Sequence, residues 1–179
     1  MKHGRWSVLL VTFLLAGAAF SRGQIENIVI PAGTPEDQAL QAITKEPDDQ
    51  KKLGMYEDFL KQFSSNPAAV AYANWQISQA YQGAGDLQKA LDYGDKALAS
   101  APHSLDILVS QASIAQQLKN NPKLLDYAVR GGEVYNSIGK APKPEGVSDQ
   151  DFASHVQEQK DGAKTSYDYL EAAAFNVIV

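Results

Sequence analysis

The chain has 179 residues, of which 44% are hydrophobic and 21% charged, which is enough for one domain or a short repeat array and excludes wholesale disorder. It has no cysteine, which excludes disulfides, thiolate metal sites and a cysteine nucleophile. A net charge of −5 argues against a nucleic-acid partner.

Residues 1–21 have the layout of a secretory signal peptide. Lys2 and Arg5 supply a positive start, residues 6–20 carry no charge, and small residues at 16–21 offer cleavage sites. At about 1.5 Å per residue this apolar run is shorter than a bilayer core of roughly 30 Å, which favours cleavage over an uncleaved membrane anchor. Removal of residues 1–21 changes the net charge from −5 to −7. We therefore expect an exported protein, periplasmic or secreted, with no membrane association after cleavage.

Residues 22–34 are expected to form an extended arm, because the sequence from Ile25 to Ile30 has an alternating pattern. Thr34 followed by Pro35 is typical of a helix start, since threonine can cap a helix and proline lacks only an N–H that would be unpaired there. Pro47 with Asp48 and Asp49 ends this short helix and begins the next.

The rest of the chain is predicted to form a series of helices, because its apolar residues recur at spacings of three and four. The predicted breaks are Asn66-Pro67, a turn at 83–86 in which Asp86 caps the next helix, Ala101-Pro102, and 120–122. Residues 139–147 are predicted to be a loop. Ser148 and Asp151 have the spacing of a capping box, which predicts a long last helix over 148–179.

The sequence repeats with a lag of 34 residues. Leu91-Asp92-Tyr93 recurs as Leu125-Asp126-Tyr127, and neighbouring positions match at the same lag, with Lys89 against Lys123 and Lys96 against Arg130. Matches at several neighbouring positions are stronger evidence than a single motif. Helix–turn–helix units with a period of about 34 are the signature of tetratricopeptide (TPR) repeats.

The chain therefore resembles the TPR family, most clearly over residues 71–104. There Tyr81, Gly85-Asp86, Ala90, Ala97 and Pro102 stand at the family's aromatic, turn and small positions, whereas Asn74 and Gly94 replace its usual aromatics. Residues 36–70 resemble a divergent first repeat and 105–138 a degenerate third one. The resemblance implies an all-α fold, an α-α superhelix or solenoid, over 35–138, with 148–179 as the helix of a further, incomplete repeat.

The resemblance also implies a binding groove lined by the first helix of each pair. Mapped on this sequence, the protein-binding residues are Tyr72, Trp75, Gln79 and Gln82 from one repeat and Asp106, Val109, Ser113 and Gln116 from the next. Aromatic and amide side chains suit an extended peptide. In the competing interpretation, Tyr72 and Trp75 are core aromatics and the glutamines are soluble helix formers.

No enzyme signature is found in the sequence. His103 and His155 have no second histidine at metal-ligand spacing, and no Gly-x-Ser-x-Gly elbow or phosphate-binding loop is present. We therefore expect no catalytic residues, no metal and no cofactor. Basic clusters with interleaved aromatics, which nucleic-acid binding requires, are also absent from the sequence.

The sequence ends in an apolar run, 172–179, where terminal repeats normally present a polar face. We expect this helix to pack on chain missing from a truncated sequence or on another subunit. The predicted function is a non-catalytic interaction scaffold or adaptor of the cell envelope that docks a protein or peptide. The alternatives are an accessory domain of a longer envelope enzyme or secretion component truncated at residue 179, and a small-ligand binder that uses Tyr72 and Trp75.

Overall fold

The computed structural model describes residues 25–178, so the predicted signal peptide at 1–21 lies outside the described residues. The described chain is all-α, as predicted, and contains no β-strand. Its helices are α1 (Pro35–Lys45), α2 (Asp49–Gln62), α3 (Pro67–Gly83), α4 (Leu87–Ser100), α5 (Leu105–Gln117), α6 (Asn121–Ser137) and α7 (Asp149–Ile178). None of these helices is long and apolar enough to cross a membrane.

The helix starts confirm the caps predicted at Thr34 and Asp86, and Asp48, which was predicted only to begin the second helix, caps it as well. The backbone N–H of Asp37 donates to Oγ1 of Thr34 at 3.2 Å, and Asp48 accepts from the N–H of Lys51 at 2.9 Å. Asp86 caps α4 through the N–H of Lys89 at 3.2 Å. Each cap satisfies one of the backbone donors that the first turn of a helix leaves unpaired. Short polar residues therefore fix where these three helices begin, whereas Ser104 makes no such hydrogen bond at the start of α5.

The predicted capping box before α7 is present only in part. The Ser148 hydroxyl oxygen accepts from the backbone N–H of Asp151 at 3.0 Å, as a cap should. The Asp151 carboxylate accepts the hydroxyl proton of Ser148 at 2.7 Å, whereas in a capping box it would accept from the cap's backbone N–H. The loop before α7 lies where it was predicted, between Ser137 and Asp149.

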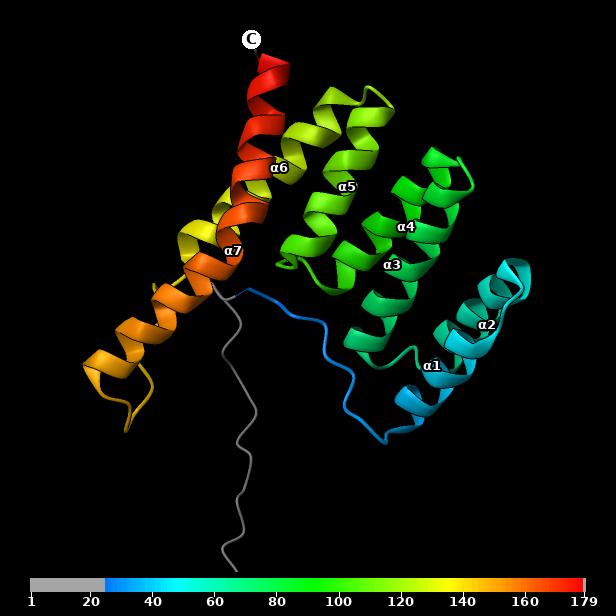
Figure 1. The fold of residues 1–179 in the computed structure, drawn as a ribbon, viewed down its shortest axis with the longest axis horizontal. Coiled ribbons are helices and arrows are strands. Elements are labelled where there is room, and N and C mark those ends of the chain that lie inside the picture. The colour runs from blue at the N-terminus through cyan, green and yellow to red at the C-terminus, as the bar shows by residue number, and fades with distance from the viewer. Residues whose placement is uncertain (1–24, 179) are drawn as a thin grey trace, which may run out of the picture.

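Consecutive helices pack against one another, so the pairs α1–α2, α3–α4 and α5–α6 lie side by side in chain order, with α7 beside α5 and α6 (Figure 1). The predicted boundary between the first two repeats, 70/71, falls inside α3, which begins at Pro67. Burial divides into two apolar clusters. The smaller is formed by α1, α2 and the start of α3, and the larger extends from Ala71 to Ala173 through α4, α5 and α6.

The 34-residue lag is also visible in the structure. Asn120 caps α6 at 3.2 Å through the N–H of Lys123, in the way that Asp86 caps α4 exactly one lag earlier. Burial follows the lag only in part. Ala90 and Leu124 are both fully buried and Asp92 and Asp126 are both exposed, whereas Leu125 is half-buried where Leu91 is buried, and Tyr93 is half-buried where Tyr127 is buried. Two caps that stand one lag apart therefore begin helices α4 and α6 in the same way.

Gly94, which departs from the TPR pattern, and Gly131 mark close approaches between helices. A Cβ at Gly94 would overlap the side-chain amide of Gln111 on α5, and a Cβ at Gly131 would overlap Cδ1 of Leu170 on α7. Each glycine therefore makes room for a buried side chain of the next pair.

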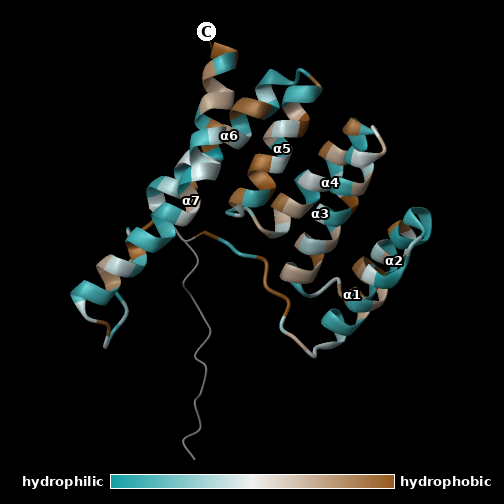
Figure 2. Ribbon diagram, viewed as in Figure 1, coloured by the Kyte–Doolittle hydropathy of each residue, from teal (hydrophilic) through white to brown (hydrophobic). Residues whose placement is uncertain are grey.

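The end of α7 presents apolar side chains to solvent. Phe175 is 65% and Ile178 74% exposed, and Val129 of α6 is 61% exposed beside them. With Leu125 and Tyr167 they line an open apolar hollow of about 340 Å³ between α6 and α7. Figure 2 shows hydrophobic colour at the C-terminal end of α7, in contrast to its mostly hydrophilic start.

Candidate functional site

Of the hollows that we describe, the one with the largest volume lies between the first helix pair and α3. Its volume is about 470 Å³. From α3 it is lined by Tyr72, Gln76, Gln79 and Ala80, at spacings that place them on one side of the helix, and from α1 and α2 by Thr44, Asp49, Lys52, Leu53 and Tyr56. The predicted groove residues Tyr72 and Gln79 are thus brought together, beside residues of the first pair that were not predicted.

A second hollow, of about 390 Å³, continues the first. The two share Thr44 and Tyr72, and the second is closed by side chains of α1, including Leu40 and Gln41, and by Ile28 and Ile30. We call the two joined hollows the Tyr72 groove. It is lined by aromatic, aliphatic, amide and charged side chains from helices of two successive pairs.

The groove offers hydrogen-bond donors and acceptors that keep their protonation state near neutral pH. Burial, followed by the neighbouring Tyr72, raises the pKa of Tyr56 to about 12, so its phenol stays neutral. Gln76 and Gln79 each present one carbonyl acceptor and an amide with two donor hydrogens. This arrangement can satisfy both the N–H and the C=O groups of an extended chain.

The other predicted groove residues are distributed differently. Trp75 is half-buried and packed against the larger cluster, with its indole Nε1 buried and without a hydrogen-bond partner among residues 25–178. Gln82, Val109 and Ser113 are half-buried, Asp106 and Gln116 are exposed, and of these five only Asp106 lines a hollow that we describe. The packing of Trp75 agrees with the competing core interpretation for that residue.

A buried polar chain lies next to Trp75. Nε2 of Gln111 on α5 donates to Oγ of Ser78 at 3.1 Å, and the Ser78 hydroxyl donates to the backbone oxygen of Ala90 on α4 at 2.6 Å. Gln111 Oε1 is buried without a partner in the described chain. This chain of hydrogen bonds joins α3, α4 and α5, so these residues hold the helices in place rather than bind a partner.

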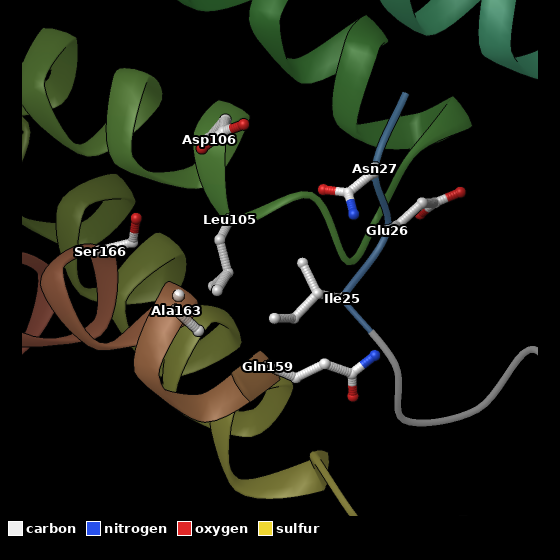
Figure 3. A pocket seen from close by; sticks show the side chains of 9 residues that line it. Ile25, Glu26, Asn27, Leu105, Asp106, Gln159, Ala163 and Ser166 are labelled. Carbon is white, nitrogen blue, oxygen red and sulfur yellow. The ribbon is translucent and has the colours of Figure 1, made fainter. Parts of the chain in front are cut away.

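A third hollow, of about 270 Å³, lies between α5, α7 and the start of the described chain. Ile25 points toward Leu105 of α5 and Ala163 of α7, with Asp106 and Ser166 beyond them (Figure 3). We call this space the Ile25 hollow. It is separated from the Tyr72 groove by residues 25–30, which we call the arm.

The arm was predicted as an extended segment, but its contacts were not. The backbone N–H of Glu26 donates to the carbonyl oxygen of His103 at 3.2 Å, and the Glu26 carboxylate accepts from the backbone N–H of His103 at the same distance. His103 lies in the turn between α4 and α5, 77 positions away in sequence. A contact over such a separation leaves no periodic signal in a single sequence.

The two histidines in the described part of the chain, His103 and His155, belong to no cluster of metal-binding side chains. His103 is half-buried and engaged with the arm through its backbone, while His155 is exposed on α7, with Nε2 3.2 Å from Nε2 of Gln159. Within residues 25–178 no group of three or more His, Cys, Asp or Glu side chains is placed to hold a metal ion.

Comparisons of the chain with protein-family models, with curated proteins and with solved structures each returned no significant match. The resemblance to TPR repeats therefore rests on the residues and the 34-residue lag of this sequence alone.

Proposed function

We propose that this chain is an exported TPR-like protein whose helix pairs stack as a solenoid and whose Tyr72 groove docks a segment of a partner protein without catalysing a reaction. The observation that carries the proposal is the groove itself, formed by α1, α2 and α3 and lined by Tyr56, Tyr72, Gln76 and Gln79. Tyrosine is enriched among the residues that dominate binding energy at protein interfaces.

Two further observations support the solenoid. Helices pack chiefly with their neighbours in sequence, as expected for an array in which each unit contacts only the next. The caps Asp86 and Asn120 stand one lag apart and start helices in equivalent positions of successive pairs. An array of this kind exposes a long surface made from several helices, which suits a protein segment better than a compact substrate.

Substituting Tyr72 and Gln79 together with alanine is expected to reduce partner capture at least tenfold. Both side chains line the groove, and loss of an interface tyrosine alone often costs about 1–3 kcal/mol, where 1.4 kcal/mol is a factor of ten. Trp75 is left unchanged because it packs against the core, so its loss would disturb the fold. The measurement is quantitative mass spectrometry of proteins captured by chain 22–179 from envelope extract of the source cells.

The matched control is the double alanine substitution of Gln88 and Asp92. These side chains are exposed on α4 and hydrogen-bonded only to each other, at 2.9 Å, among the described residues. This control should capture the same partner in the same amount as the unaltered chain. Equal recovery by the Tyr72 and Gln79 variant would contradict docking in the groove.

A further inference from the structure

The arm lies along two hollows that are lined by helices α1, α3, α5 and α7. Ile25 lines the Ile25 hollow with residues of α5 and α7, Glu26 is hydrogen-bonded to the α4–α5 turn, and Ile28 and Ile30 line the Tyr72 groove with Tyr72 of α3 and Leu40 of α1. Figure 1 shows it as the blue segment that passes from α7 to α1 along one end of these helices. An extended segment therefore already lies against the face from which the Tyr72 groove is formed.

The arm is held through alternate parts of its chain. Ile25 and Ile28 pack against the larger apolar cluster and Ile30 against the smaller one, whereas Asn27 and Val29 are exposed. His103, in the turn between α4 and α5, is hydrogen-bonded to both the backbone N–H and the carboxylate of Glu26. The contacts thus define a pattern: apolar, acidic, any residue, apolar, any residue, apolar.

The arm does not fill the space that it lies in. The inward isoleucines are only half-buried, and unfilled hollows of about 270 and 390 Å³ remain on its two sides. The contacts that hold it most specifically are the two hydrogen bonds to His103. A segment held by few hydrogen bonds and half-buried side chains can open while the helices stay folded.

We infer that the arm is a displaceable ligand of this face, bound in cis, and that the partner presents an extended segment with the same apolar–acidic–x–apolar–x–apolar pattern. This inference rests on the proposed function and adds to it the chemistry of the partner. The arm and the partner segment exclude each other beside Tyr72 and His103. Because the arm competes for this face, a partner segment must bind it more tightly than it would if the arm were absent.

The test uses a labelled synthetic peptide of the arm, IENIVIP, and the chain in which Ile25, Ile28 and Ile30 are all changed to serine. An arm tethered beside its site competes at an effective concentration of order 1 mM, so release of the arm should tighten peptide binding at least tenfold. The matched control changes the outward residues Asn27 and Val29 to serine and should bind as weakly as the unaltered chain. Fluorescence anisotropy gives the affinities, and circular dichroism shows that each variant keeps its helices.

A second peptide, with lysine in place of the glutamate, should bind the released chain at least fivefold more weakly, because the carboxylate that accepts from His103 N–H is lost. Failure of the folded released chain to bind IENIVIP would overturn the inference. Equal binding by all three chains would also overturn it, because the peptide would then bind elsewhere. Neither result bears on the capture of a partner through Tyr72 and Gln79, which the mass-spectrometry experiment tests. The proposed function can therefore stand when this inference fails.

A measurement on the unaltered chain provides an independent check. The Glu26 amide, bonded to His103, is expected to exchange its hydrogen at least tenfold faster than amides within α5, because the arm opens while the helices remain. If the Glu26 amide exchanged as slowly as the amides within α5, the arm would leave its place only when the helices unfold. That result would overturn the inference that a partner displaces the arm.

Discussion

Replacing Leu170 with alanine is expected to lower the free energy of unfolding by about 2–5 kcal/mol, the range found for fully buried leucines. Leu170 has no exposed surface, and its Cδ1 occupies the space that the missing side chain of Gly131 leaves open on α6. Leu105 of α5 lies at the same point, 3.8 Å from where a Gly131 Cβ would be. The substitution would therefore open a cavity where three helices meet.

Urea unfolding followed by circular dichroism measures this effect, and Ile178 provides the matched control on the same helix. Ile178 is 74% exposed, so its change to alanine should alter stability by no more than about 0.5 kcal/mol. A similar small loss for Leu170→Ala would contradict the packing of α7 onto α5 and α6.

Stability is expected to fall as the pH rises above about 10, because two buried tyrosines keep their protons in the folded state. Burial, then the hydrogen bond to Asp95 and its charge, raises the pKa of Tyr127, and burial raises that of Tyr56 to about 12. In the unfolded chain both pKa values are about 10. Between pH 10 and the folded pKa, the folded state binds more protons, so raising the pH favours unfolding.

Each phenol should cost about 1 kcal/mol between pH 10 and pH 11, or roughly 2 kcal/mol for the two, because the unfolded phenols are already half deprotonated at pH 10. Urea midpoints at pH 8 to 11 measure the loss. Tyr127→Phe should remove about half of the pH dependence, at a cost at pH 8 of roughly 1–2 kcal/mol for the 2.6 Å hydrogen bond from its hydroxyl to Asp95. Constant stability from pH 8 to pH 11 would show that neither phenol is shielded from water.

The sequence was sufficient to predict features that depend on local chemistry. Thr34 and Asp86 cap helices in the structure as predicted, because a cap depends only on a short polar side chain and the backbone three residues on. The spacing of apolar residues and the positions of Pro, Gly and Asn predicted the order of helices and breaks for the same reason. The boundary at 70/71 missed the start of α3, because Asn66 and Pro67 begin the helix four residues earlier.

Contacts between segments that are far apart in the sequence could not be predicted from its local patterns. Gly94 appeared only as a departure from the TPR pattern, whereas the structure shows that Gly94 and Gly131 make room for Gln111 and Leu170. Nothing in the sequence around Ile25 indicated that the arm would meet α5 and α7.

The site was predicted only in part for the same reason. Tyr72 and Gln79 line the groove, as expected from their place on the first helix of a pair. Tyr56 was not among the predicted groove residues, and its ring, which combines an apolar body with a polar hydroxyl, was the signal that could have placed it at the groove. Trp75 was expected to line the groove with Tyr72, but it lies half-buried against the larger cluster.

The central claim, that a partner segment docks in the Tyr72 groove, is tested most directly by cross-linking. A photoreactive amino acid at position 79 places the probe in the groove, and one at position 92 places it on the exposed surface of α4. In extract of the source cells, the account predicts a discrete protein adduct from position 79 that is lost with Tyr72→Ala and absent from position 92. The absence of an adduct at position 79, or the same adduct from both positions, would contradict it.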